Sequence, residues 1–297
     1  MSFKSGFVTI IGRPNVGKST LLNKIAGEKI AITSNKPQTT RNTIRTVVTN
    51  KEYQMIFIDT PGIHKPKTKL GEYMVDAATG TMKDVDAVLF LVEATEGRAG
   101  VGDNYIIEQL KNVKTPVILV INKVDKVKKE TILALIQHYS ELLDFKTVIP
   151  ISALQGEGVE IVLGELVKLL HEGPQYFPDD MLTDQPEKVI VAEMIREKLL
   201  NLLEDEIPHG IGVEVMTFKE RPGKGILDIQ ATIYCERDSH KGIVIGKQGA
   251  VLKKIGTLAR VDIERFLGTK VYLELWVKVK ADWRNSNAML KTLGYTK

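Results

Sequence analysis

The stretch "GRPNVGKST", Gly12–Thr20, decides the fold of this chain. It contains the pattern GxxxxGK[ST] and joins an apolar segment, "FVTIIG", to a stretch with helical character, Lys18–Ala26. In this arrangement the glycines leave room for backbone N–H groups to wrap phosphates, and the helix N-terminus adds positive potential. We expect Lys18 to reach the β- and γ-phosphates and the Ser19 hydroxyl to bind Mg²⁺. The stretch therefore predicts a nucleotide-phosphate site.

Strand and helix signals alternate over residues 7–170. Apolar strand candidates are "FVTIIG", "YQMIFID", "AVLFLVEA", "PVILVINK" and "TVIPIS". Helical stretches between or after them are Lys18–Ala26, Asn104–Asn112, Thr131–Leu143 and Val159–Leu170. This alternation predicts an α/β fold with a mostly parallel sheet and helices on both faces. "IRTVVTN" lies one short turn before "EYQMIFID", so we expect these two segments to form an antiparallel hairpin.

Three further motifs follow apolar strands and identify the nucleotide. In "DTPG", Asp59 is expected to hold Mg²⁺ through water, and the Gly62 N–H to meet the γ-phosphate. In "NKVD", the Asp125 carboxylate is suited to accept hydrogen bonds from guanine N1–H and the 2-amino group, which adenine lacks. Lys123 is expected to pack its stem along the base, and the backbone of "ISA", residues 151–153, to meet guanine O6. The predicted nucleotide is therefore GTP.

The nucleotide-binding residues predicted from these motifs are Gly12, Asn15, Val16, Gly17, Lys18, Ser19, Thr20, Asp59, Thr60, Pro61, Gly62, Asn122, Lys123, Asp125, Ser152 and Ala153.

The pattern changes after residue 173. Prolines, a glycine and acidic residues predict an extended linker over 174–186, between a GTP-binding domain, 1–173, and a smaller domain, 187–297. In the smaller domain Val191, Ile195, Leu199 and Leu202 mark one face of a helix. Alternating apolar residues predict strands near 211–215, 227–233 and 271–279.

A second glycine loop, "GKQG" at Gly246–Gly249, lies between two predicted short helices of the smaller domain. It is too short to wrap a triphosphate and has no Lys-Ser after it. A GxxG loop in this order of elements is the device by which KH domains clamp single-stranded RNA. The predicted RNA-binding residues are Lys241, Ile243, Ile245, Gly246, Lys247, Gln248, Gly249 and Lys253, with Lys254 adding charge.

Charge distribution agrees with a polyanion partner for the second domain. Residues 210–297 hold 16 Lys and Arg against 9 Asp and Glu, although the whole chain carries a formal charge of only +4. A solvated basic face is the alternative interpretation of this excess. The single cysteine excludes an internal disulfide, and the apolar runs are too short for membrane spans. We expect a cytoplasmic protein without a signal peptide.

The motifs resemble a known group of proteins. Gly12–Ser19, Asp59–Gly62, Asn122–Asp125 and Ile151–Ala153 are similar to the G1, G3, G4 and G5 motifs of translation-factor-class GTPases, and "PQTTRN", residues 37–42, to G2. The resemblance assigns γ-phosphate sensing and Mg²⁺ ligation to Thr40, with Thr39 as the alternative. The predicted catalytic set is then Lys18, Thr40, Asp59 and Gly62, and the metal set Ser19, Thr40 and Asp59.

One such G domain followed by one bacterial-type KH domain resembles the Era family of GTPases. This resemblance implies GTP and GDP as ligands, binding near the 3′ end of 16S ribosomal RNA, action in small-ribosomal-subunit assembly, and peripheral association with the inner membrane. We expect a monomer. The alternative kept open is an RNA-binding switch in which hydrolysis is only a timer.

The sequence leaves the acceleration of hydrolysis unexplained. Many GTPases place a glutamine directly after the DxxG glycine, whereas Ile63 stands here, followed by His64. Arg13 and Arg41 are the candidate arginine fingers, and both are expected at the surface. Similar GTPases with an asparagine at the position of Asn15 use it to ligate K⁺ beside the phosphates, which gives K⁺ as a second expected cofactor.

Overall fold

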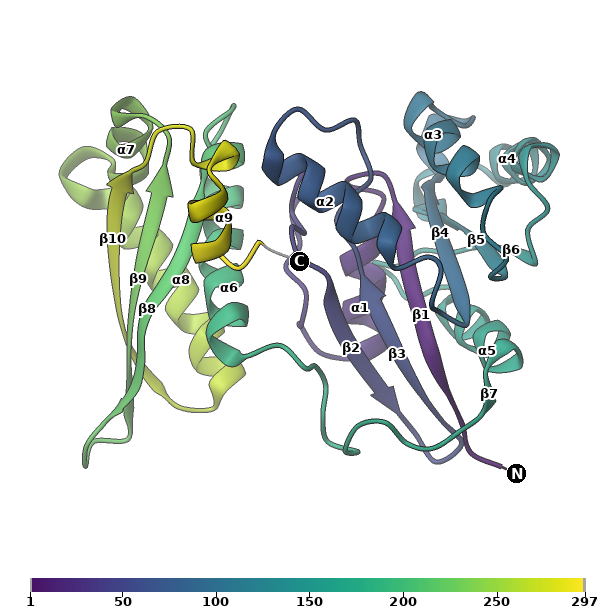
Figure 1. Ribbon diagram of the computed structural model, residues 1–297, viewed down its shortest axis with the longest axis horizontal. Helices are drawn as coiled ribbons and strands as arrows, with labels where there is room; N and C mark the ends of the chain where they lie inside the picture. The colour runs from purple at the N-terminus through teal and green to yellow at the C-terminus, as the bar shows by residue number, and fades with distance from the viewer. Residues whose placement is uncertain (1, 296–297) are drawn as a thin grey trace. The chain divides into compact units, whose positions relative to one another are not determined.

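The computed structural model describes residues 2–295, and the chain folds into two compact units (Figure 1). Among the described residues, the first unit contains 2–33, 40–66 and 74–184, and the second contains 34–39, 67–73 and 185–295. The second unit therefore includes two short segments that come from the N-terminal half of the sequence.

The first unit is built on a seven-stranded sheet with the order β2-β3-β1-β4-β5-β6, to which β7 adds antiparallel to β1. The strands are β1 Lys4–Gly12, β2 Ile44–Thr49, β3 Tyr53–Asp59, β4 Ala87–Glu93, β5 Val117–Asn122, β6 Thr147–Pro150 and β7 His171–Glu172. The helices are α1 Lys18–Ala26, α2 Lys69–Gly80, α3 Val101–Leu110, α4 Lys129–Leu142 and α5 Val159–Leu169, and one-turn helices η1 and η2 span Ala94–Glu96 and Val124–Lys126.

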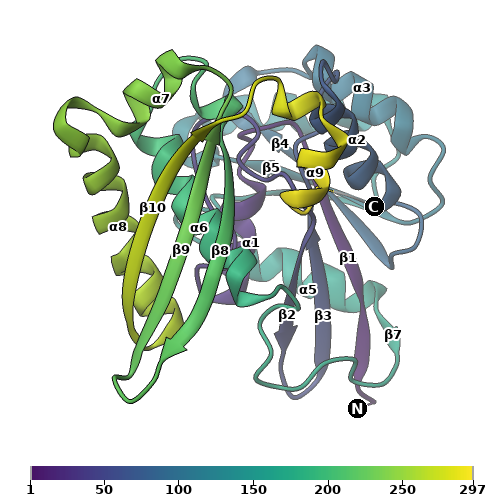
Figure 2. The same cartoon turned by 60° about the vertical axis from the view of Figure 1, so that its left-hand side comes forward.

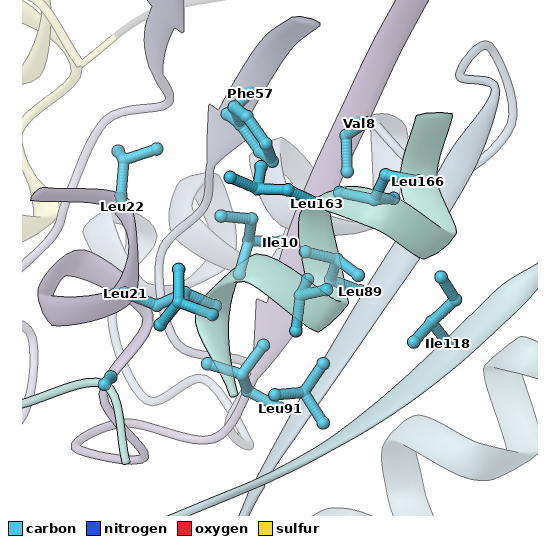
Figure 3. Packing of buried hydrophobic residues seen from close by; sticks show 14 of the residues in the cluster. Val8, Ile10, Leu21, Leu22, Phe57, Leu89, Leu91, Ile118, Leu163 and Leu166 are labelled. Atoms are coloured by element: carbon cyan, nitrogen blue, oxygen red, sulfur yellow. The ribbon is translucent and has the colours of Figure 1, made fainter. Parts of the chain in front are cut away.

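Two hydrophobic layers hold this sheet. One face packs on α1 and α5, where Leu21 and Leu166 meet Ile10 and Leu89 of the strands (Figure 3). The other face packs on α2, α3 and α4. Because both faces are covered, β4 and β5 are almost continuously apolar, as expected for buried parallel strands.

The predicted fold class is confirmed, and so is the antiparallel hairpin of β2 and β3. The predicted helix Lys18–Ala26 has the observed bounds, whereas α3 and α4 begin two or three residues before their predicted starts. Helix α2 was not predicted at all. Its buried apolar positions Leu70, Met74 and Ala78 repeat every four residues, so the spacing of a helix is present in the sequence.

The second unit is a three-stranded sheet with the order β10-β9-β8, packed on α6 and α8 (Figures 1 and 2). Its elements are α6 Glu187–Leu202, β8 Gly212–Arg221, β9 Ile226–Cys235, α7 Asp238–Ile245, α8 Ala250–Leu267, β10 Lys270–Val279 and α9 Asn287–Thr292, with one-turn helices η3 Pro208–Gly210, η4 Lys247–Gly249 and η5 Trp283–Asn285. Strands β8 and β9 are antiparallel, and β9 and β10 are parallel.

The alternation predicted for β10 is confirmed. Val271, Leu273 and Leu275 pack into the core of the second unit, while Tyr272 and Trp276 on the opposite face are about half exposed. The prediction of two short helices around the GxxG loop was wrong for the second one, because α8 has 18 residues. Its buried positions Ile255, Ala259 and Ile263 repeat every four residues and keep the helix on the sheet for its whole length.

Candidate functional site: a phosphate loop and a basic groove

The predicted nucleotide motifs meet at one edge of the first sheet. Strands β1, β3, β4, β5 and β6 are parallel, so their carboxyl ends lie at the same edge. Gly12, Asp59 and Asn122 are the last residues of β1, β3 and β5. Ligands of open α/β sheets bind outside the carboxyl ends of the strands. The topology therefore brings the four motifs together.

The loop after β1 holds Lys18 in place. Its ammonium donates to the carbonyl oxygens of Gly12 at 3.1 Å and Arg13 at 3.0 Å, and burial lowers its pKa to about 8 against the opposing attraction of Asp59. An anionic ligand at this ammonium favours the charged form and raises the pKa again. Gly17 has φ +101°, and a Cβ there would lie 2.2 Å from Asn122 Nδ2, so this position requires glycine.

Gly62 also lies directly against the phosphate loop. A Cβ on Gly62 would lie 2.6 Å from the backbone nitrogen of Pro14, and the N–H of Ile63 donates to the Gly12 carbonyl at 3.1 Å. The "DTPG" segment is thus fixed on the loop by its backbone. The Thr60 hydroxyl donates to the carbonyl of Ile10 at 2.7 Å, which gives this side chain a local structural partner.

Hydroxyl and carboxylate oxygens converge beside Lys18. Ser19 Oγ lies 2.8 Å from Asp59 Oδ2 and 3.0 Å from Thr40 Oγ1, and Thr40 Oγ1 lies 3.5 Å from the same Asp59 oxygen. Asp59 Oδ1 is buried without a hydrogen-bond partner, and burial raises the pKa of this carboxyl. An orphaned carboxylate oxygen beside two hydroxyls is a donor set that fits Mg²⁺. Thr39 is a poorer candidate than Thr40, because its hydroxyl donates to the Lys36 carbonyl at 2.6 Å.

The expectation that both candidate arginine fingers lie at the surface was wrong. Arg41 is 1% exposed. Arg13 turns to α3, where its Nε donates to Asp103 at 2.7 Å and its Nη2 pairs with Glu96 at 2.7 Å. Asp103 is itself buried and accepts the N–H of Gly100 at 3.1 Å. This anchoring network fixes the beginning of the phosphate loop and occupies the Arg13 guanidinium.

The loop Asn122–Asp125, which is expected to bind the base, is held in place by the side chain of Asn122. Its Nδ2 donates to the Val16 carbonyl at 2.8 Å, while its Oδ1 accepts the N–H groups of Lys123 at 2.8 Å and Ala153 at 3.0 Å. One side chain thus joins three of the predicted motifs. The Ala153 N–H, which we expected to meet guanine O6, points to Asn122 here. Ser152 is fully buried beside it.

Lys123 has a partner that the sequence did not reveal. Its ammonium lies 2.7 Å from Glu93 Oε2 at the end of β4, and the attraction of Lys123 and the Thr95 hydroxyl hold the pKa of Glu93 below its usual value in spite of burial. Lys123 has φ +65°, which turns the chain so that Asp125 follows at the surface. Among residues 2–295 no hydrogen bond or ion pair occupies the Asp125 carboxylate, so it is free to receive a base.

The residues after "DTPG" supply no water-orienting group at the expected position. Ile63 is 1% exposed and packs in the hydrophobic layer under α2 and α3. His64 Nδ1 lies 2.9 Å from the Gly62 carbonyl oxygen. The apolar side chain at position 63 is therefore part of the core.

The second glycine loop has the geometry of a tight connection. Gly246, Gln248 and Gly249 have φ values of +73°, +52° and +78°, and α8 begins at Ala250 directly after them. The N-terminal N–H groups of α8 therefore open at this loop. Lys247 and Gln248 are exposed on it.

A groove of about 580 Å³ runs from this loop between α8 and the edge strand β10. Its wall on the α8 side is formed by Gly249, Leu252, Lys253, Gly256, Thr257 and Arg260. The β10 side is formed by Tyr272, Leu273 and Leu275. Of the predicted RNA-binding residues, Gly249 and Lys253 line this groove. Ile243 and Ile245, expected to line a groove for bases, lie on α7 and are not among its walls.

Comparison with known proteins agrees with both halves of this description. Residues 7–123 match a family described as "50S ribosome-binding GTPase", and residues 206–284 match the KH domain family. The chain is 68% identical over 295 residues to the GTPase Era of Ruminiclostridium cellulolyticum, covering 99% of this chain and 98% of the relative. It is 62% identical over 296 residues to the GTPase Era of Alkaliphilus oremlandii, covering 99% and 100%.

Solved structures give the same result. The chain resembles a crystal structure of Era in complex with MgGDPNP and nucleotides 1506–1542 of 16S ribosomal RNA, with a TM-score of 0.96, 40% identity, and coverage of 99% of this chain and 100% of that one. A variant of Aquifex aeolicus Era bound to GDP and AlF₄⁻ is similar to the same extent. Because the relatives match this chain nearly from end to end at high identity, the chain belongs to the Era family of GTPases.

Proposed function

We propose that this GTPase couples GTP hydrolysis at the first loop to binding of 16S ribosomal RNA in the groove beside the second loop, during assembly of the small ribosomal subunit. The observation that supports this most directly is the pair of glycine loops, one wrapping a fixed lysine and one opening a basic groove. The RNA is inferred from the relative that was solved with nucleotides 1506–1542 of 16S ribosomal RNA. The functional parts we propose are residues 1–173, 174–186 and 187–297.

We assign the nucleotide to the motif residues as the sequence predicted. Asp125 reads guanine, Lys18 neutralises charge on the β- and γ-phosphates, and the Gly62 N–H meets the γ-phosphate. Ser19, Thr40 and Asp59 hold Mg²⁺, which when bound neutralises negative charge on these phosphates. The relative solved with MgGDPNP supports this metal.

We further propose that Asn15 holds K⁺ beside the phosphates. Arg13 is occupied by Asp103 and Glu96, so it is not available as a cation for the transition state. Asn15 has φ +67° within the loop, a conformation that asparagine tolerates better than most residues. A cation there neutralises charge that develops between the β- and γ-phosphates, as an arginine finger does.

The runner-up function is an RNA-binding switch for which hydrolysis serves only as a timer. The buried, apolar Ile63 in place of a water-orienting glutamine favours slow intrinsic hydrolysis. Single-turnover measurement of RNA release separates the two. Release at the rate of GTP cleavage supports coupling, and release that is independent of cleavage supports the timer.

The experiment for the proposed function uses Lys247→Asp together with Gln248→Asp. Both side chains are exposed, and Asp tolerates the positive φ of position 248, so the fold is retained while negative charge faces the RNA backbone. We expect affinity for nucleotides 1506–1542 of 16S ribosomal RNA to fall by at least about 100-fold, with unstimulated GTP hydrolysis unchanged. Crosslinking in cell extract with GTP, followed by sequencing of the bound RNA, identifies the natural site. Normal RNA binding by the double variant would refute the function.

Cytoplasmic location, a monomeric state and peripheral contact with the inner membrane remain part of the proposal. They rest on the family resemblance. Within the described part of the chain, no helix combines the length and apolar character needed to cross a membrane. Flotation of the purified protein with vesicles of inner-membrane lipid composition tests the membrane contact.

A further inference from the structure

We propose that Tyr272, backed by the guanidinium of Arg221, is a stacking platform for one nucleobase at the end of the groove remote from the GxxG loop. This inference rests on the proposed RNA-binding function and extends its site beyond the loop. The RNA strand that lies in the groove would leave it over this ring.

The position of Tyr272 follows from the register of α8 and β10. Along the groove, Gly249 lies at the GxxG end, Gly256 lies opposite Leu275, and Arg260 comes one turn of α8 later. Tyr272 precedes Leu275 by three residues on β10 and therefore marks the far end. Because β10 is the edge strand, Tyr272 reaches the groove although it belongs to the opposite face of the sheet.

Arg221 is held in one orientation behind this ring. Asp228 is the direct cross-strand neighbour of Tyr272, and its carboxylate receives two hydrogen bonds from Arg221, Nε to Oδ2 at 3.1 Å and Nη2 to Oδ1 at 2.5 Å. The Arg221 Cζ then lies 5.1 Å from the centroid of the Tyr272 ring. A two-point pair of this kind fixes the plane of a guanidinium. The ring is thus supported on one face while 51% of the residue remains exposed.

The surroundings fit a nucleotide. Lys219 is the cross-strand neighbour of Asp228, and Lys270 is the cross-strand neighbour of Ile226. Both lysines are exposed, and Arg260 lines the groove. Two carboxylates at this end are engaged: Asp228 with Arg221, and Glu264 with the N–H of Val271 at 3.0 Å. An exposed aromatic face beside solvent-facing cations is the combination that binds a base and its phosphate in single-stranded nucleic acids.

The alternative role for the Tyr272 and Arg221 pair is to stabilise the β8–β9 hairpin only. RNA affinity distinguishes the two roles, because a structural pair changes unfolding without contributing a stacked base. The test uses the full chain and the RNA fragment of nucleotides 1506–1542, with affinity measured by fluorescence anisotropy. Tyr272→Ala should weaken binding about 10-fold, as expected for loss of one stacked base. Tyr272→Phe should bind within about 2-fold of the unchanged chain, because the ring remains.

Two further readouts address the mechanism. The slope of log affinity against log salt concentration should be the same for Tyr272→Ala and the unchanged chain, since no phosphate contact is lost, whereas Lys270→Gln should make it shallower. In a series of fragments with 2-aminopurine at successive positions, the fluorescence of one position should be quenched on binding and recover in Tyr272→Ala. Tyr105→Ala is the matched control, because Tyr105 is a comparably exposed tyrosine on α3.

The outcomes of these experiments distinguish failure of the stacking platform from failure of the proposed RNA-binding function. If Tyr272→Ala binds normally while the double variant of Lys247 and Gln248 does not, the platform is wrong and the groove stands. If the double variant binds normally, the proposed RNA function itself fails. Equal losses in Tyr272→Phe and Tyr272→Ala would assign the effect to the hydroxyl and overturn stacking.

Discussion

At the scale of single residues, Asp125 carries the choice of nucleotide. Its carboxylate is exposed and free, on a loop that Asn122 fixes to both the phosphate loop and Ala153. A carboxylate at this place accepts two donors from guanine, and adenine offers neither. Specificity thus depends on one side chain whose position is set by another.

Asp125→Asn should therefore weaken GTP binding by at least about 100-fold and improve binding of xanthosine triphosphate, because an amide donates where xanthine presents an oxygen. Equilibrium titration with fluorescent analogues of both nucleotides measures the change. Asp125→Ala is the control and should lose both ligands. GTP affinity that is unchanged in Asp125→Asn would remove Asp125 from base recognition.

A second prediction concerns Asn15. If Asn15 holds K⁺, hydrolysis in K⁺ should be at least about 10-fold faster than in Na⁺ at equal ionic strength, a difference of about 1.4 kcal/mol in the barrier. The preference should disappear in Asn15→Ala when both proteins are saturated with GTP. Initial rates of phosphate release in the two salts are the measurement. Equal rates for the unchanged chain would point to a ribosomal partner as the activator.

The motif residues could be predicted from the sequence because their chemistry is tied to short, local spacing. Their partners could not. Glu93 beside Lys123, and Asp103 with Glu96 around Arg13, are brought in by the strand order β1-β4-β5 and by α3. The resemblance already favoured Thr40 over Thr39, and the structure adds the physical reason, because Thr40 lies beside Ser19 while Thr39 donates to the Lys36 carbonyl. Arg41 was misplaced at the surface because an arginine in a polar loop gives no sign of burial.

At the scale of elements, the GxxG connection shows that its two glycines serve different purposes. Both have positive φ, but a Cβ on Gly246 would lie 2.4 Å from Val251 Cγ2, whereas nothing lies within 4 Å of a Cβ on Gly249. Gly246 is needed for packing of the loop on the first turn of α8. Gly249 is needed for its conformation and leaves open space at the groove.

Gly246→Ala should therefore lower the free energy of unfolding of the second unit by about 2–4 kcal/mol, combining backbone strain with overpacking. Gly249→Ala should cost only about 1–2 kcal/mol, from strain alone. Adding Val251→Ala should recover part of the loss in Gly246→Ala and none in Gly249→Ala. Chemical denaturation of the four variants measures these values, and equal costs at the two glycines would contradict the packing role.

The elements themselves were predictable to different degrees. Strand β10 was clear because its two faces differ along ten residues, and α1 because the phosphate motif fixes its start. The length of α8 was missed because its outer face carries exposed apolar residues, Leu258 and Val261, which blur the helical periodicity. We expected residues of α7 to line the groove, whereas it lies between α8 and β10. The pairing of a helix with an edge strand depends on the whole fold and could not be predicted from local sequence.

At the scale of the whole molecule, the two units have separate hydrophobic cores. Two clusters lie on the faces of the first sheet, and one lies between the second sheet and its helices. Because each unit has its own core, we expect the two units to unfold as separate cooperative transitions. The nucleotide motifs belong almost entirely to the first unit, so a bound nucleotide stabilises that transition.

Cys235, the only cysteine of the sequence, reports on the unfolding of the second unit. Cys235 is fully buried in the core of the second unit, and burial raises the pKa of its thiol to about 11. Only the thiolate reacts with disulfide reagents. In the folded chain the thiol stays protonated between pH 7 and pH 9, so its labelling should remain slow over this range. In the unfolded chain, with an ordinary pKa near 8.5, labelling should accelerate by roughly 20-fold over the same range.

When GDP is added, calorimetry should show a higher unfolding temperature for the first unit, whereas the temperature at which the thiol is labelled should not change. GDP at about 100 times its dissociation constant stabilises the first unit by about 2.7 kcal/mol and should raise the midpoint of its transition by roughly 5–10 °C. The temperature at which Cys235 becomes reactive should stay where it was, because the core around it binds no nucleotide. Cys235→Ala gives the labelling background and should show the same two calorimetric transitions. A parallel rise of the labelling temperature with GDP would mean that the chain unfolds as one cooperative body, with the two cores linked more strongly than their separate packing requires.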